Sequence, residues 1–181
     1  MVEGVDIMKT LNWVAVHVIG VAVSLVSLPC LAAETRIAVL DFELNDLTLM
    51  PRTPEELERT ASLGPLLRAA LAKKPGYEVV PIQQADRAVA DVAFGYLFEH
   101  PDVAAQLGSR FGADWVAVGR LHKPSFLFAY LKVRVVNVKT EQIAGEYVVE
   151  IKGYLKKLAE RGTAQLADQI DDTIRQGVTV P

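Results

Sequence analysis

The sequence predicts an α/β protein with a mixed five-stranded sheet, in the order β-α-β-α-β-β-β-α. In the first half, short apolar runs alternate with segments of helical periodicity, which is typical of parallel strands joined by right-handed crossovers. Three further strand patterns follow with only short turns between them, which predicts an antiparallel C-terminal meander. The last part of the chain has apolar residues at helical spacing. We therefore expect helices packed on a sheet that is parallel first and antiparallel later.

The first strand is expected at residues 36–44, where the run IAVL is continuous and apolar, as in a strand covered on both faces. The sequence TPEELERT then predicts a helix over residues 54–73, with Thr53 as its N-cap and a proline at its first position. The Gly64–Pro65 pair interrupts the helical pattern, so we expect either a kink or two short helices in this segment.

Two more strands follow, with two helical segments between them. A short second strand is expected at residues 77–80, and a helix at residues 81–100. A further helical segment at residues 101–112 ends in a glycine, which is typical of a C-terminal cap. The third strand is expected at residues 114–121, because DWVAVGRL is mostly apolar.

The last three elements are two long strands and a helix. The strands are expected at residues 126–136 and 143–153, and the helix at residues 154–176. Leucine and isoleucine recur along one side of this helix, which predicts that it packs on the sheet.

The turn between the two long strands predicts their register. Glu141 stands where a positive φ is often needed, which suggests a three-residue loop with a bulge. Val138 should then oppose Gln142. Counting back from that pair, Arg134 should oppose Glu146.

Residues 1–33 predict a signal peptide, and residues 34–181 predict one α/β domain. Lys9 precedes an apolar run of about 20 residues that ends in small residues, as in secretory leaders. Two acids stand before Lys9, so Met8 is the better start. The run is also long enough to span a bilayer, and Cys30, the only cysteine, could carry a lipid. We expect a periplasmic or secreted protein that touches a membrane only if the leader is kept or lipidated.

The charge balance and the missing motifs exclude several function classes. The chain has 19 lysines and arginines against 22 acids and no basic block, so it lacks an electrostatic footprint for nucleic acids. It has no Gly-rich phosphate loop, no dinucleotide fingerprint and no zinc-type spacing of Cys and His. We therefore expect no cofactor, no metal and no catalytic residue. His122 and Ser125 leave a serine hydrolase as a third hypothesis, although no nucleophile-elbow pattern surrounds the serine.

Asp41 and Glu43 are candidate binding residues at the end of the first strand. Ligands of parallel sheets bind beyond the carboxyl ends of the strands, near which both acids are expected. Strand alternation places the two carboxylates on the same side, where they could bind a cation or act as an acid/base pair. The alternative is that Asp41 only caps the following loop, by accepting backbone hydrogen bonds, while Glu43 is solvated.

The fourth strand carries a second candidate surface. Phe128, Tyr130, Lys132 and Arg134 occupy every second position, so one face of the strand begins aromatic and ends basic. This face could dock a partner or a ligand. The alternative is that a helix covers the aromatic residues, while the cations pair with glutamates of the next strand, such as Glu146.

The segments RIAVLDFEL, GADWVAVGRLHKPS, VNVKTEQIAG and VEIKG lie within residues 36–153. Together they resemble an uncharacterised family of secreted bacterial proteins that has only a domain-of-unknown-function label. More distantly, their layout is similar to the amino-terminal domain of TolB and to the CsgG-like envelope proteins. The resemblance implies a non-enzymatic role in the envelope or periplasm and supplies no catalytic residue.

The sequence therefore favours a secreted or periplasmic accessory protein that is not an enzyme. Its expected partner is a protein of the envelope, or a periplasmic enzyme system that it supports. The alternative hypothesis is a module that binds a small ligand or a metal through the acidic end of the first strand.

Overall fold

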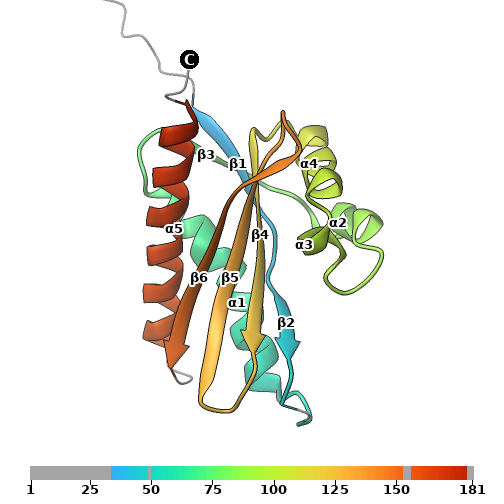
Figure 1. Ribbon diagram of the computed structural model, residues 1–181, viewed down its shortest axis with the longest axis vertical. Helices are drawn as coiled ribbons and strands as arrows, with labels where there is room; N and C mark the ends of the chain where they lie inside the picture. Colours follow the sequence, from blue (N-terminus) through green and yellow to red (C-terminus); the bar gives the residue numbers. More distant parts are fainter. Residues whose placement is uncertain (1–33, 49, 153–155, 179–181) are drawn as a thin grey trace, which may run out of the picture. The chain divides into compact units, whose positions relative to one another are not determined.

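The computed structural model describes residues 34–48, 50–152 and 156–178, and in this part a sheet carries helices on both faces (Figure 1). The strands are β1 (Thr35–Val39), β2 (Glu43–Asp46), β3 (Tyr77–Val80), β4 (Trp115–Lys123), β5 (Phe128–Asn137) and β6 (Gln142–Lys152). The helices are α1 (Pro54–Ala72), α2 (Gln84–Ala90), α3 (Tyr96–Glu99), α4 (Pro101–Arg110) and α5 (Lys156–Val178). None of the helices within these ranges is long and apolar enough to cross a membrane.

The sheet has the mixed topology that the sequence predicts. Its strand order is β3-β1-β4-β5-β6, and β2 also pairs with β4. Strand β1 runs parallel to both β3 and β4, whereas β4, β5 and β6 form an antiparallel meander. The α/β class, the parallel first half and the antiparallel second half are therefore confirmed.

The two faces of the sheet are covered to different extents. On one face, α1 and α5 bury a core along the length of the long strands, with Leu67, Ile170 and Leu131 fully buried in it. On the other face, α3 and α4 enclose a smaller core, which includes Leu107 and Val116. Figure 1 shows α2, α3 and α4 gathered at one end of this second face. The other end of that face therefore has no helix over it.

The first predicted strand is broken by a bulge into β1 and β2. The last pair of β1 joins Val39 to Ala117, and the first pair of β2 joins Glu43 to Arg120. Three residues thus separate β1 from β2, whereas two separate their partners on β4. The extra residue reverses the alternation of side chains, so Phe42 joins the core beneath α1. An uninterrupted strand at residues 36–44 was a wrong prediction.

The helical segments differ from the predictions in two places. The expected Thr53 cap is confirmed, since its side chain accepts a hydrogen bond from the N–H of Glu56. Helix α1 is continuous through the Gly64–Pro65 pair, so the prediction of two short helices is wrong. Pro65 has no N–H to donate to the preceding turn, but it is exposed, so water can bond to the carbonyl oxygen that is left without a partner. A single helix over residues 81–100 is also wrong, because Gly95 has a φ of 78° and separates α2 from α3.

The hairpin between β5 and β6 keeps one expected pair although its turn differs. Asn137, and not Val138, opposes Gln142, so the predicted turn pairing is wrong by one residue. A register shift next to the turn then compensates, and Arg134 opposes Glu146 as predicted.

Replacing Glu141 by glycine is expected to raise the free energy of unfolding by about 1 kcal/mol, because its φ of 58° brings the Cβ atom close to the backbone. Thr140→Gly is the matched control, since Thr140 has no positive φ and glycine there adds only entropy to the unfolded chain. Urea unfolding of both variants measures the difference. A Glu141→Gly protein less stable than the wild type would contradict this account of the turn.

Candidate functional site

Cross-strand pairing arranges the partly covered face of the sheet in three rows. Residues directly opposite one another on neighbouring strands lie on the same face. The rows are Asn45–His122–Tyr130–Glu150, Glu43–Arg120–Lys132–Val148, and Val118–Arg134–Glu146. On the reverse face, the corresponding row of Leu44, Leu121, Leu131 and Val149 is buried beneath α1 and α5.

The row that contains Arg134 is covered by α3 and ion-paired. The Arg134 guanidinium donates to Glu146 at 3.0 Å, to Glu99 at 2.9 Å and to the carbonyl oxygen of Phe98 at 2.7 Å. It also lies 4.3 Å from the centroid of the Phe98 ring. The predicted Arg134–Glu146 ion pair is therefore confirmed, and the charge of Arg134 is already used within the fold.

Glu43 lies in the same covered region, and its side chain is 10% exposed. Its carboxylate accepts a hydrogen bond from the N–H of Gly95 at 3.2 Å, and lies 3.6 Å from Arg87 and 3.7 Å from Arg120. Burial raises the pKa of Glu43, although the hydrogen bond from Gly95 opposes this change. The idea of a solvated Glu43 is thus wrong: the residue joins the sheet to the segment before α3.

Asp41 lies on the opposite face of the sheet from Glu43. Its carboxylate accepts a hydrogen bond from Arg68 of α1 at 2.9 Å, and its carbonyl oxygen accepts one from Arg87 at 3.0 Å. The bulge therefore separates the two acids, and the expected same-side carboxylate pair is wrong. Asp41 ties α1 to the sheet rather than capping the loop that follows it.

A groove of about 440 Å³ lies between these elements and is lined by both acids, together with apolar side chains such as Leu57 and Phe94. Both carboxylates already pair with arginines, as described above. Within the described ranges, no three side chains of the metal-binding types converge. The groove consequently offers no cation site that the two carboxylates would share.

Within the described ranges no helix packs over the aromatic half of the fourth-strand face, where Tyr130 and His122 are half-buried, so the alternative of a covering helix is wrong. We call this surface the open face; it consists of Asn45, His122, Tyr130, Lys132, Val148 and Glu150. Val148 is 51% exposed, and the rings of His122 and Tyr130 lie 6.4 Å apart. Phe128, which is 39% exposed, lies where β5 begins, beyond the end of this face. The open face thus combines aromatic, apolar and charged groups on a rigid sheet.

His122 is expected to make stability depend on pH. Burial, with the charges of Lys132 and Arg120, lowers the pKa of His122 below 6.5, and its Nδ1 lies 3.1 Å from Nδ2 of Asn45. As the pH falls, His122 is protonated at a higher pH in the unfolded chain than in the folded protein. The free energy of unfolding therefore decreases as the pH drops below about 6.5. From about pH 7 to about pH 5, we expect the urea midpoint to fall less in His122→Gln than in the wild type. Equal falls in the two proteins would contradict this.

A buried ion group lies at the end of β4, where the sequence predicts only a polar turn. Lys123 is 4% exposed; its ammonium lies 3.3 Å from the carboxylate of Asp46 and also donates to Glu56. Burial alone would lower the pKa of Lys123, but the hydrogen bonds to Glu56 and Asp46 outweigh it and leave the pKa raised. The three side chains join the end of β2, the first turn of α1 and the end of β4.

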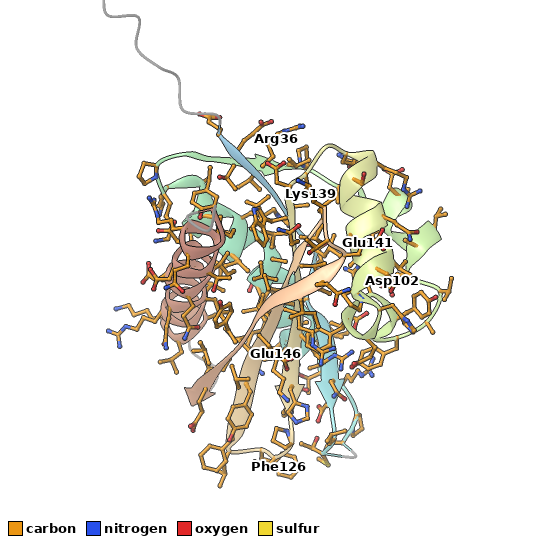
Figure 2. The ribbon with its side chains drawn as sticks, turned by 45° about the horizontal axis from the view of Figure 1, so that its top comes forward. Arg36, Asp102, Phe126, Lys139, Glu141 and Glu146 are labelled. Carbon is orange, nitrogen blue, oxygen red and sulfur yellow. The ribbon has the colours of Figure 1, made fainter. Side chains whose placement is uncertain are left out.

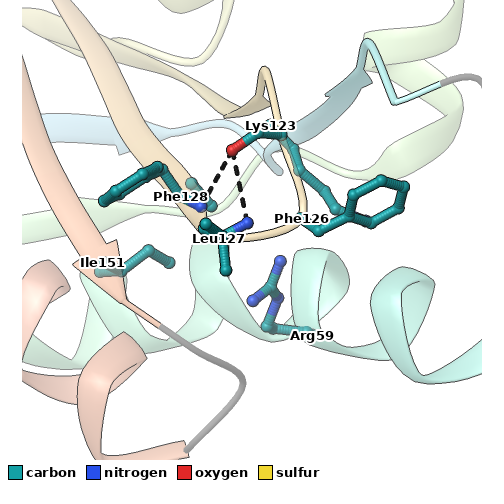
Figure 3. Close-up of a pocket in the computed structure, with 8 residues that line it drawn as sticks. Arg59, Lys123, Phe126, Leu127, Phe128 and Ile151 are labelled. Carbon is teal, nitrogen blue, oxygen red and sulfur yellow. Dashed lines mark hydrogen bonds between the residues drawn. The ribbon is translucent and has the colours of Figure 1, made fainter.

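The hydrolase hypothesis finds no support in the positions of Ser125 and His122. The Ser125 hydroxyl accepts hydrogen bonds from the N–H groups of Leu127 and Phe128, at 3.3 Å each (Figure 3). The His122 ring contacts Asn45 instead. In the part of the chain that the structure describes, no hydrogen bond joins the serine to the histidine, so the base that would activate a nucleophile is not in place.

A family described as "Protein of unknown function (DUF2380)", DUF3280, matches residues 35–170. The chain belongs to this family. The expected membership of an uncharacterised family is thereby confirmed, and the family's description states no activity. None of the curated proteins matches the chain.

Solved structures share the fold of this family member at low sequence identity. The hypothetical protein CT253 from Chlamydia trachomatis has a TM-score of 0.57 at 12% identity, covering 79% of this chain and 99% of that one. The PelC dodecamer from Paraburkholderia phytofirmans gives 0.51 at 12% identity, covering 80% and 91%. TolB from Acinetobacter baumannii gives 0.42 at 13% identity, covering 81% and 28%. The first two show a shared fold; the likeness to TolB is too remote to support a further argument.

Proposed function

We propose that this chain is an exported, non-enzymatic accessory protein of the bacterial envelope that binds a protein partner through its open face. The observation that carries the proposal is the uncovered half of the sheet face between β2 and β6. A helix would normally cover such a surface in a monomeric α/β protein, because aromatic and aliphatic side chains gain free energy when they leave water.

The chemistry of the open face suits a protein partner. Tyr130 and His122 offer flat rings with polar edges, which are favoured at protein interfaces. Val148 adds an exposed aliphatic group, and Lys132 and Glu150 supply opposite charges at the rim. Because all five side chains stand on paired strands, little backbone entropy is lost when a partner binds.

The proposed location rests on the leader and on the resemblance to secreted and envelope proteins. The predicted signal peptide, Met8 start and Cys30 lipidation all fall in residues 1–33, which lie outside the described residues. The proposal therefore takes residues 34–181 as the exported domain. A periplasmic location would place the open face where envelope proteins can reach it.

The small-ligand alternative has a weaker physical basis. The groove beside Asp41 and Glu43 is large enough for a small molecule, at about 440 Å³. However, Arg68 already pairs with Asp41, and Arg87 and Arg120 with Glu43. A ligand would have to displace these ion pairs, whereas a partner could contact Tyr130 and the exposed Val148 of the open face without doing so.

The proposal is tested by affinity capture with the tagged full chain in cells of the organism that encodes it. The wild type should retain a defined partner, and the double variant Tyr130→Ser/Val148→Ser should retain at least about tenfold less, as expected when buried anchors are removed. The matched control is Val89→Ser/Val92→Ser, which alters two valines that are 74% and 71% exposed, in and just after α2.

Urea unfolding should show that both double variants are folded. Equal capture by the two variants would overturn the assignment of the open face. Failure of the wild type to retain any partner would overturn the proposed function itself.

A further inference from the structure

A second apolar surface lies at the end of the sheet where β4 connects to β5. We call it the apolar tip; it consists of Leu47, Met50, Phe126, Leu127 and Phe128. These five side chains are between 39% and 72% exposed. Figure 2 shows Phe126 at one extreme of the structure, with Arg36 near the other. The tip is thus separate from the covered helical end of the sheet.

The two loops that form the tip contain no charged residue. They read LTLMP at residues 47–51 and PSFLF at residues 124–128. Charged residues make up 23% of the whole chain, so about two would be expected among ten residues of average composition. Soluble surfaces normally intersperse charges among exposed apolar groups. The two loops therefore present five large apolar side chains and no charge of their own, although Arg59 and Lys123 line the hollow behind Phe126 and Phe128. Such loops suit a medium that is itself apolar.

Several polar groups among the described residues of these loops bond within the protein. The N–H of Leu47 donates to the carbonyl oxygen of Lys123 at 2.9 Å, and the N–H of Thr48 donates to Asp46 at 2.9 Å. The Thr48 hydroxyl also donates to Asp46, at 2.7 Å. On the other loop, Ser125 accepts from two backbone N–H groups, as Figure 3 shows by dashed lines. Such internal bonding is what hydrocarbon requires of a backbone, since lipid tails offer no hydrogen-bond partner.

The shape of the tip also favours lipid. The hollow behind its side chains has a volume of only about 10 Å³, so it cannot receive a side chain from a partner. In Figure 3 the ring of Phe126 lies apart from Leu127, Phe128 and Ile151, and the Lys123 ammonium is 5.9 Å from the centroid of that ring. The buried Lys123–Asp46–Glu56 group joins the two loops at their base, because Asp46 and Lys123 directly precede them.

We propose that the apolar tip inserts into the boundary between the headgroups and acyl chains of a lipid membrane. Aromatic and aliphatic side chains on loops bury their apolar surface at this depth. Because the loops are uncharged, a zwitterionic bilayer suffices and salt does not weaken the contact. This membrane contact is separate from any made by residues 1–33, and it does not depend on the open face.

The test places an environment-sensitive nitrobenzoxadiazole dye on the full chain at Leu127→Cys, in a Cys30→Ser background. The control carries the same dye at Val89→Cys, on α2, which is exposed like Leu127. Each protein is mixed with phosphatidylcholine vesicles, with and without phosphatidylglycerol. At Leu127→Cys we expect a blue shift, a several-fold rise in emission and quenching by spin-labelled acyl chains, alike in both vesicles and at high salt. The dye at Val89→Cys should not respond.

Three results would overturn the proposal. One is an unchanged spectrum at Leu127→Cys with both vesicle types. Another is a response that needs phosphatidylglycerol and disappears in salt, which would indicate adsorption by charge. The third is a response at Leu127→Cys to cell extract freed of lipid but not to vesicles, which would show that the tip fits a protein pocket. None of these results bears on the open face, so failure here is distinguishable from failure of the proposed function.

Discussion

Replacing Lys123 by methionine is expected to lower the free energy of unfolding by about 3–5 kcal/mol. Lys123, Asp46 and Glu56 are each almost completely buried, with side chains 5%, 4% and 5% exposed. Methionine preserves most of the side-chain volume but removes the cation, which leaves two carboxylates facing each other without compensation. Urea unfolding at neutral pH measures the loss, because the midpoint falls in proportion to the stability.

The matched control for this change is Lys139→Met, on the exposed hairpin turn, which should alter stability by less than about 0.5 kcal/mol. The triple variant Lys123→Met/Asp46→Asn/Glu56→Gln should recover part of the loss, since it removes the unpaired charges along with the cation. A Lys123→Met protein as stable as the Lys139→Met protein would show that the ion group contributes nothing.

Replacing Gly119 by alanine is expected to cost about 1–3 kcal/mol, because the added methyl group overpacks a closed core. A Cβ atom on Gly119 would lie 2.5 Å from the ring of Phe42, which the bulge between β1 and β2 turns toward α1. Thermal or urea unfolding measures the effect. In a Phe42→Leu background the same substitution should cost much less, since the ring atoms that it meets are gone.

The control is Gly177→Ala in α5, where the nearest atoms to an added Cβ are those of Trp115 at 3.6 Å, an ordinary contact. Alanine there should leave stability unchanged or raise it by up to about 1 kcal/mol, because alanine is the better helix former. If Gly119→Ala proves as harmless as Gly177→Ala, the packing of Phe42 against β4 is wrong.

The fold was largely predictable because local patterns and chain order agree. The alternation of apolar runs with helical segments predicts the parallel strands, and the short turns predict the meander. The bulge was not predictable, because no glycine or proline marks it between Val39 and Glu43. The break before α3 was equally hidden, since Gly95 reads as an ordinary residue within a helical pattern.

The candidate site was partly predictable, for a reason that its residues make clear. A period of two is enough to place Tyr130 and Lys132 on one face of β5. The single-residue bulge breaks this alternation between Asp41 and Glu43, so their side chains lie on opposite faces of the sheet. The Lys123 ion group joins segments 67 or more residues apart, and a lysine in a turn gives no sign that it will be buried.

The most direct test of the open face as a docking surface is site-specific photo-crosslinking in cells of the organism that encodes the chain. Benzoylphenylalanine replaces Val148 on the open face in one protein and Val89 on α2 in the other; both positions are more than half exposed. On irradiation, we expect one defined protein adduct from position 148 and none of that mass from position 89. No adduct from position 148, or the same adducts from both positions, would contradict the proposal that this face binds a partner.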